Sequence, residues 1–153
     1  MKLTSPAFEH EGTIPTQYTC DGENTSPALH ISDVPEGTIC LALIMEDPDV
    51  PKDVREDGMW DHWVVWNIPS DTTDLPETIV PPGIQGHNTR GTLGYQGPCP
   101  PDKEHRYFFK LYALDTTLDL KEGSTKQELL NVIEGHIVAE AILMGTYDRP
   151  QNQ

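Results

Sequence analysis

This chain has no long hydrophobic run and few basic residues. None of its apolar segments approaches the ~20 residues that a membrane-spanning helix needs, and the stretch Met1–His10 lacks the apolar core of a signal peptide. Its 10 lysines and arginines face 25 aspartates and glutamates, which gives a net charge of −15. A surface of this charge repels nucleic acid and anionic membranes. These absences predict a cytoplasmic protein with no nucleic-acid partner and no stable membrane association.

Cysteine is scarce as well, with only Cys20, Cys40 and Cys99 in the chain. An odd number of cysteines does not suggest a disulfide framework. Free cysteines are usually buried or partly buried, so we expect three free thiols. Cys99 stands between two prolines, where we expect a structural role rather than a reactive one.

The short motifs of common enzymes and metal sites are missing too. The sequence has no HxH, HExxH or CxxC, which argues against a dedicated zinc site. It has neither GxSxG nor the phosphate-cradling GxxxxGK[ST], and no serine has a neighbouring base. We therefore expect no metal, no cofactor and no catalytic residues.

What the sequence does contain is strand-forming stretches cut by turns. Fourteen prolines and twelve glycines favour many short segments, and hence one mainly β domain over residues 1–153. The stretch 70–82 should be irregular. Thr125 and Glu128 form a capping box before an amphipathic helix at 126–134. Strands are predicted at 2–8, 14–20, 26–31, 38–45, 60–68, 106–114 and 136–147.

Two of the strongest strands are joined by a long polar loop, 47–59, of the kind that often carries function. Asp47 ends the first strand, and His62 begins the second. If these strands pair, the two side chains emerge at the same end of a sheet. A carboxylate beside an imidazole raises its pKa and fixes its tautomer, so the pair could bind an anion or shuttle a proton. The alternative is that Asp47 only accepts loop N–H groups in an Asx turn.

A second candidate region combines a stiff segment with the start of the next strand. Three of the five residues in Gly97–Pro101 are prolines, which lack an N–H. His105 and Tyr107 follow, two apart on a predicted strand, so they share a face and could both point into one pocket. The alternative is a surface histidine and a core tyrosine.

Several of these stretches together resemble one protein family, the phosphatidylethanolamine-binding proteins. The chain is most similar to the short bacterial and archaeal members called Raf kinase inhibitor-like. The resemblance implies a β-sandwich around a large antiparallel sheet, with a small anion-binding pocket near one end. It is carried by DPDVP at 47–51, DHWVVWNIP at 61–69, GYQGPCPP at 94–101 and HRYFFKLYALD at 105–115, with CDGENTSPALH at 20–30 and EGHIVAEAILMGTY at 134–147.

The resemblance also implies which residues make the pocket. Asp61 stands where some eukaryotic relatives have a second histidine, which predicts a less cationic pocket. The chain ends soon after Tyr147, without the C-terminal helix that covers the pocket in longer members. We therefore expect a more open pocket, to which lipid or kinase specificity does not simply carry over. The implied pocket residues are Asp47, His62, Gly97, Pro101, His105 and Tyr107, with Pro51 and Trp60 at the rim.

The leading hypothesis is a non-enzymatic, regulatory protein that binds a small anion: phosphate, a phosphoethanolamine-like head group or a carboxylate. Two or three charge-assisted hydrogen bonds would give an affinity on the order of micromolar to millimolar. The alternative is a kinase-inhibitor-like protein–protein module whose pocket receives a phosphorylated or acidic side chain. An acid–base hydrolase using Asp47 and His62 ranks lowest, because neither a nucleophile nor a metal accompanies them. The resemblance adds a homodimer as a further expectation.

Overall fold

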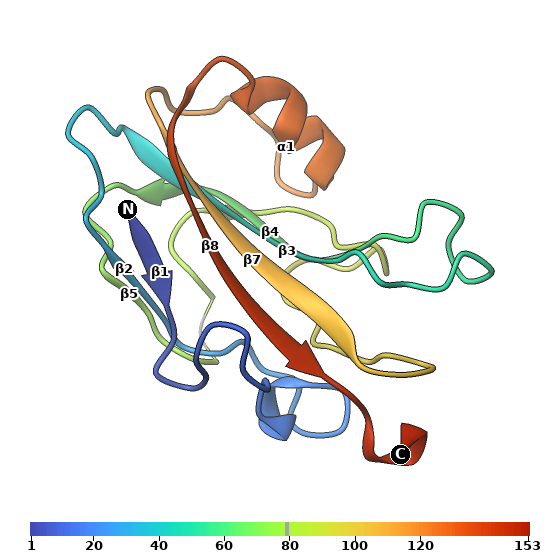
Figure 1. The fold of residues 1–153 in the computed structure, drawn as a ribbon. Coiled ribbons are helices and arrows are strands. Elements are labelled where there is room, and N and C mark those ends of the chain that lie inside the picture. Colours follow the sequence, from blue (N-terminus) through green and yellow to red (C-terminus); the bar gives the residue numbers. More distant parts are fainter. Residues whose placement is uncertain (79) are drawn as a thin grey trace.

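The computed structural model describes residues 1–78 and 80–153. Over these residues the chain forms two antiparallel sheets and one α-helix, so the predicted mainly β sandwich is confirmed (Figure 1). The strands are β1 (Lys2–Thr4), β2 (Leu29–Ser32), β3 (Cys40–Asp47), β4 (Trp60–Pro69), β5 (Asp74–Leu75), β6 (Ile84–Gln85), β7 (His105–Leu114) and β8 (Ile137–Tyr147). The helix is α1 (Lys126–Ile133), and 3-10 helices cover Thr16–Tyr18 and Pro150–Asn152. The larger sheet has the order β6-β4-β3-β7-β8, and the smaller has the order β1-β2-β5.

The central strand β3 is buried along its whole length because both faces of the larger sheet are covered. Successive side chains of a strand point to opposite faces. Leu41, Leu43 and Met45 pack toward the smaller sheet, in one core cluster. Ala42 and Ile44 pack in a second cluster that includes the buried face of α1. An uninterrupted apolar run is the expected sequence of such a strand.

The capping box predicted at the start of the helix is present, with the side chain of Thr125 accepting from Glu128 N. Two other local predictions were wrong. The stretch 14–20 contains the 3-10 helix Thr16–Tyr18 in place of a strand, because Tyr18 N donates back to Pro15 O in a tight turn. Within 70–82, expected to be irregular, β5 pairs with β2. Residue 79 of that stretch lies outside the described residues.

The prediction of three free thiols was wrong for two of them. Cys20 and Cys99 form a disulfide, with 5.4 Å between their Cα atoms and 79 residues between them in sequence. The fold brings the two loops together, since Cys20 N also donates to Pro98 O at 3.1 Å. Cys40 is free and buried, and burial raises the pKa of its thiol.

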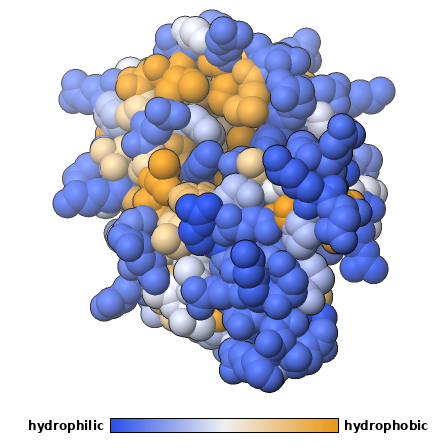
Figure 2. All heavy atoms as spheres, turned by 45° about the vertical axis from the view of Figure 1, so that its right-hand side comes forward, coloured by the Kyte–Doolittle hydropathy of each residue, from blue (hydrophilic) through white to orange (hydrophobic). Residues whose placement is uncertain are grey.

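Most of the surface is hydrophilic, but Figure 2 shows hydrophobic side chains gathered in patches on one face. Three of the large exposed hydrophobic residues, Ile137, Val138 and Ile142, belong to the edge strand β8. None of the helices formed by residues 1–78 and 80–153 is both long enough and apolar enough to cross a membrane.

Candidate functional site

Three neighbouring strands bring the predicted site residues to one end of the larger sheet. β3 ends at Asp47, which lies opposite Trp60 at the start of β4. On the other side of β3, the antiparallel strand β7 begins at His105. Because antiparallel neighbours reverse direction, the end of β3 meets the starts of both β4 and β7.

A cavity of about 220 Å³ opens at this end of the sheet. Five of the eight residues predicted for the pocket line it: Asp47, Trp60, His62, Pro101 and His105. Pro51, Gly97 and Tyr107 are near it in the fold but not among its lining residues. Sequence reasoning missed the other lining residues, which are Val50, Val54, Gln96, Cys99 and Pro100.

The loop pattern suggested that Asp47 pairs with His62. In the structure the carboxylate of Asp47 pairs with His105 instead. Asp47 Oδ2 lies 2.6 Å from His105 Nδ1, and both side chains are buried. The other carboxylate oxygen of Asp47 accepts from Asp49 N at 2.7 Å. The Asx-turn alternative is therefore also present, because Oδ1 of Asp47 accepts from the loop N–H of Asp49 while Oδ2 contacts the imidazole of His105.

The second nitrogen of His105 contacts another carboxylate, which the sequence did not point to. Asp102 Oδ1 lies 2.7 Å from His105 Nε2. Burial alone would lower the pKa of His105, but the hydrogen bonds and charges of Asp47 and Asp102 outweigh it and raise the pKa. Carboxylates only accept, so both ring nitrogens donate and the ring is an imidazolium.

His62 is in a different electrostatic environment. Its Nδ1 lies 2.6 Å from the carbonyl oxygen of Gln96, whose N–H donates back to His62 O at 2.9 Å. A carbonyl only accepts, so Nδ1 carries the proton and Nε2 is the acceptor of the neutral ring. Burial lowers the pKa of His62, despite the Gln96 hydrogen bond and the nearby Asp47. His62 is therefore neutral near pH 7.

Tyr107 is fully buried directly beside the two histidines. Its ring meets that of His62 edge-on at 5.3 Å and stacks with that of His105 at 6.4 Å between centroids. Burial raises the pKa of its hydroxyl, which stays protonated. Among the described residues this hydroxyl has no hydrogen-bond partner, which is uncommon for a buried donor.

Comparisons with known proteins show the family to which the chain belongs. The family model of the phosphatidylethanolamine-binding proteins matches residues 4–148. The chain belongs to the phosphatidylethanolamine-binding protein family. It is 52% identical to the UPF0098 protein of Methanothermobacter thermautotrophicus, over 97% of this chain and 99% of the relative. A crystal structure of a putative phosphatidylethanolamine-binding protein homolog from Chlamydia trachomatis has a TM-score of 0.95 at 51% identity, covering 97% of each chain. Escherichia coli YbcL has a TM-score of 0.87 at 33% identity, covering 97% of this chain and 98% of its own.

In this member of the family, Gly97 and Cys99 fix one wall of the cavity to an N-terminal loop. Gly97 N donates to Asn24 Oδ1 at 2.8 Å. A Cβ at Gly97 would collide with Tyr18 O and with that same amide oxygen, so only glycine fits this close approach. Cys99 is held to the loop by the disulfide to Cys20. Gly97 thus supports the pocket without lining it.

Residues after β8 brace the same wall and loop. Asn152 Nδ2 donates to Pro100 O at 3.0 Å. Arg149 forms an ion pair of 3.0 Å with Asp21, which also accepts from the hydroxyl of Tyr147 at 2.7 Å. The short 3-10 helix Pro150–Asn152 therefore contacts the outside of the pocket wall.

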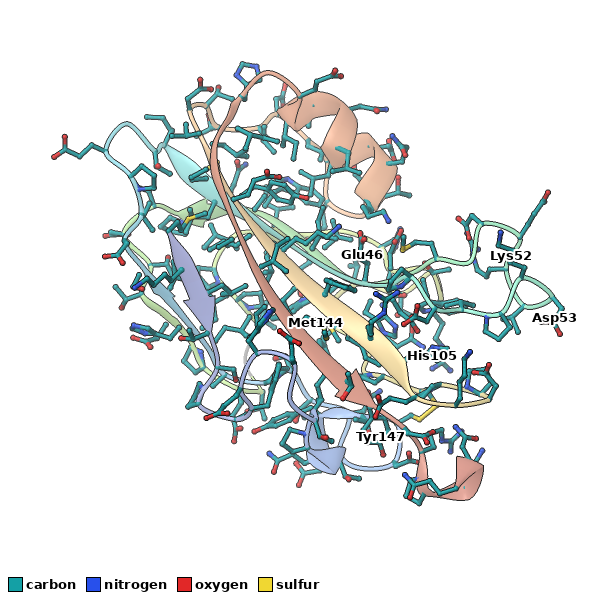
Figure 3. All side chains as sticks on the ribbon, in the orientation of Figure 1. Glu46, Lys52, Asp53, His105, Met144 and Tyr147 are labelled. Atoms are coloured by element: carbon teal, nitrogen blue, oxygen red, sulfur yellow. A yellow bond between two sulfur atoms is a disulfide. The ribbon has the colours of Figure 1, made fainter. Side chains whose placement is uncertain are left out.

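The β3–β4 loop, which carries the lining residues Val50 and Val54, extends away from the sheet (Figure 1). Pro51 shapes this loop, because its carbonyl oxygen accepts from Val54 N at 2.9 Å. Lys52 and Asp53 lie at the far end of the loop, away from His105 (Figure 3). Pro51 therefore places Val54 at the cavity without lining it.

Most other charged groups around the cavity are paired with each other. Asp61 forms an ion pair of 2.7 Å with Lys126, which also contacts Glu46. Arg106 binds both carboxylate oxygens of Asp49, at 2.9 and 2.7 Å. The positive charge of Lys126 therefore offsets the negative charge of Asp61.

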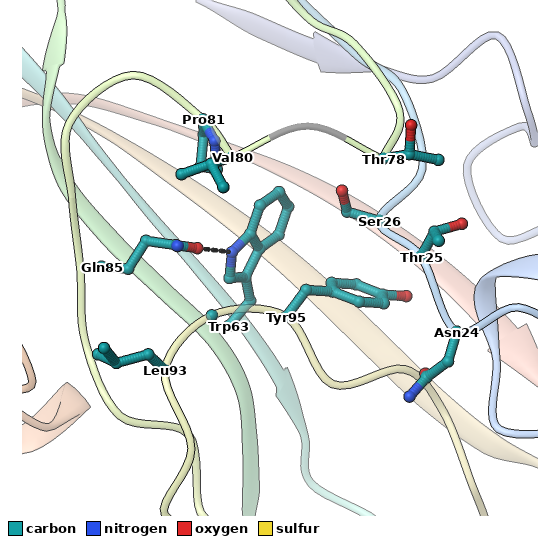
Figure 4. Close-up of a pocket in the computed structure, with 11 residues that line it drawn as sticks. Asn24, Thr25, Ser26, Trp63, Thr78, Val80, Pro81, Gln85, Leu93 and Tyr95 are labelled. Carbon is teal, nitrogen blue, oxygen red and sulfur yellow. Dashed lines mark hydrogen bonds between the residues drawn. The ribbon is translucent and has the colours of Figure 1, made fainter.

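A second cavity of about 240 Å³ lies beside Trp63 and Tyr95 (Figure 4). None of the described residues that line this second cavity has a charged side chain. Trp63 Nε1 donates to Gln85 Oε1 at 3.1 Å, and Tyr95 donates to Tyr18 O at 2.7 Å. The polar groups of its two large aromatic residues are therefore already used. The cavity that holds the two histidines is the better candidate for a binding site.

Proposed function

We propose that this protein binds a small oxyanion, such as phosphate, the phosphate of an ethanolamine-like head group or a carboxylate, in the cavity at the ends of β3, β4 and β7. The observation that carries the proposal is the cavity itself. Two buried histidines line it, and beside them lies a buried tyrosine hydroxyl that has no hydrogen-bond partner among the described residues. A concave, mainly apolar site with a few convergent polar groups is the usual form of a small-ligand site.

The side chains of the cavity suggest how the ligand is held. Nε2 of His62 is free of the Gln96 contact and can accept from a protonated oxyanion, or donate once the ring is protonated. Val50, Pro100 and Pro101 supply apolar walls, which strengthen these hydrogen bonds by excluding water. Each charge-assisted bond contributes ~1.5–3 kcal/mol, so two such bonds correspond to a dissociation constant on the order of tens of micromolar to millimolar.

We also propose that binding is not followed by chemistry. Among the described lining residues there is no serine, threonine or tyrosine, and the sulfur of Cys99 is held in a disulfide. Asp47 is occupied by His105 and Asp49 N. These groups supply positions for hydrogen bonds but no activated nucleophile.

Titration with phosphate, followed by the NMR signals of the histidine rings, tests the proposal. We expect the His62 and His105 signals to shift with a micromolar to millimolar midpoint. His62→Ala should weaken binding by about tenfold or more, because it removes one hydrogen bond to the charged ligand. His136→Ala is the matched control, since His136 is half-exposed and pairs with Asp115. Unchanged His62 and His105 signals at millimolar phosphate would contradict the proposal.

The pH dependence of anion binding gives a second test, with sulfate as a probe that does not titrate near neutrality. The pKa of His62 lies below its usual value of about 6.5. Sulfate favours the protonated ring, so affinity should rise as pH falls through that pKa, by at most about tenfold per pH unit. The raised pKa of His105 keeps that ring charged over the same range. The slope should vanish in His62→Ala, and a sloping profile in that variant would rule out His62 as the group responsible.

A protein partner that inserts a phosphorylated or acidic side chain is a second candidate function. It is favoured by Val54, which lies at the cavity and is 55% exposed on a loop that extends from the sheet. A protein partner would contact the exposed side chain of Val54, whereas a small anion can bind in the cavity without that contact. If partner capture is the same for wild type and His62→Ala, the pocket is not the contact.

A further inference from the structure

His105 is held between two carboxylates that differ in how firmly they are fixed. Asp47 is buried at the end of β3 and also accepts from Asp49 N. The Asp102 side chain is 41% exposed and belongs to the loop before β7, while the His105 side chain is 1% exposed. Asp47 is therefore a fixed partner of His105, and Asp102 is the partner that can exchange.

Only one nitrogen of His105 can serve a ligand. Nδ1 is held by Asp47 in the interior, so the positive charge of the ring is reachable only at Nε2. Asp102 Oδ1 already accepts from Nε2 at 2.7 Å, at the distance of a charge-assisted hydrogen bond. An incoming oxyanion and the Asp102 carboxylate therefore compete for the same N–H.

We propose that Asp102 is a specificity-determining residue, whose carboxylate holds the position on His105 that a ligand oxyanion takes. This inference rests on the proposed function of the cavity. Every simple anion must then compete with the carboxylate of Asp102, which is attached to the chain only three residues from His105. This competition keeps the affinities of simple anions low.

The displaced carboxylate then selects for a second feature of the ligand. After exchange, Asp102 keeps its negative charge three residues before His105, whose side chain lines the cavity. The neighbouring carboxylates are occupied, because Asp47 stays with His105 and Asp49 is bound by Arg106. An ammonium group on the ligand would pair with Asp102, whereas a second negative charge would be repelled. The site should therefore prefer an oxyanion with an ammonium group nearby over the same oxyanion without one.

Two probes of similar size separate these effects. Ethyl phosphate and phosphoethanolamine differ mainly in the ammonium group, and calorimetric titration gives the affinity of each. Asp102→Asn keeps the shape of the side chain and removes its charge. Glu104→Gln is the matched control, since Glu104 is exposed in the same loop and the change in net charge is the same.

We expect Asp102→Asn to bind ethyl phosphate more tightly, on the order of tenfold, and Glu104→Gln to change it by less than about twofold. The preference of the wild type for phosphoethanolamine over ethyl phosphate should shrink in Asp102→Asn and persist in Glu104→Gln. Equal affinities of wild type and Asp102→Asn for ethyl phosphate would overturn this inference while leaving the proposed function intact.

An NMR pH titration of His105 in the absence of ligand gives the pKa of its ring, which tests the Asp102 contact independently of binding. The pKa of His105 should fall in Asp102→Asn and stay unchanged in Glu104→Gln, because the carboxylate of Asp102 is hydrogen-bonded to Nε2 of the ring. An unchanged pKa in Asp102→Asn would show that the contact is not made in solution and would overturn the inference by itself. If neither probe binds to any variant, the proposed function fails, and the role of Asp102 fails with it.

Discussion

Replacing Cys20 and Cys99 together with serine is expected to lower the free energy of unfolding by about 2–5 kcal/mol. The disulfide joins residues 79 apart, and a crosslink that closes a loop of this length strongly restricts the unfolded chain. It also ties the pocket wall to the N-terminal loop, so phosphate binding should weaken in the same variant. Urea titrations of both proteins give the difference in unfolding free energy.

The reduced wild-type protein is the natural control for this variant. A thiol reductant should shift the unfolding midpoint of the wild type toward that of the double variant and leave the variant unchanged. Cys40 is buried and free in both proteins, so it does not contribute to the difference. A wild-type midpoint that is insensitive to complete reduction would show that the crosslink does not stabilise the fold.

Replacing Asp47 with alanine is expected to lower the free energy of unfolding by about 3–5 kcal/mol at about pH 6, because it leaves a buried imidazolium without its buried carboxylate partner. The sign of the pH dependence follows from the raised pKa of His105. A histidine whose pKa is higher in the folded state stabilises it fully below the unfolded pKa of about 6.5, and this contribution is lost as pH rises through the folded pKa. The effect of Asp47→Ala should therefore shrink above that range.

Asp49→Ala is the matched comparison for Asp47→Ala. It removes a carboxylate from the same loop, but the Asp49–Arg106 pair is partly exposed, with side chains 22% and 52% accessible. Such a pair is worth about 0–1 kcal/mol. Thermal unfolding of the two variants across the pH range measures both effects. If Asp47→Ala and Asp49→Ala lower the free energy of unfolding equally, the buried Asp47–His105 pair stabilises the fold no more than the partly exposed Asp49–Arg106 pair does.

Strand positions were the most predictable part of the structure. The run Leu41–Met45 stops at a carboxylate between polar loop residues, and the position of Asp47 at the end of β3 follows from that pattern. The capping box at Thr125 is equally local, since it depends on two residues three apart. Family resemblance then placed His62 and His105 at one cavity, which periodicity alone left open.

Features that depend on the meeting of distant loops could not be predicted. Nothing in the spacing of three cysteines shows that Cys20 lies beside Cys99, because the fold sets that distance. Which histidine Asp47 would pair with depends on β7 lying beside β3, an arrangement that is not visible in the β3–β4 stretch. Asp102 is an exposed loop residue with no periodic pattern, so its contact with His105 gave no signal.

The bracing of the pocket wall by residues after β8 has a consequence for the order of folding during synthesis. Asn152 contacts Pro100, and Arg149 contacts Asp21, so one wall is supported by segments from both halves of the chain. β8 also completes the sheet beside β7. A chain emerging from the ribosome can pair β3 with β4 early, but the finished pocket must wait for residues 137–152. A nascent chain stalled before these residues should therefore be unable to retain a ligand.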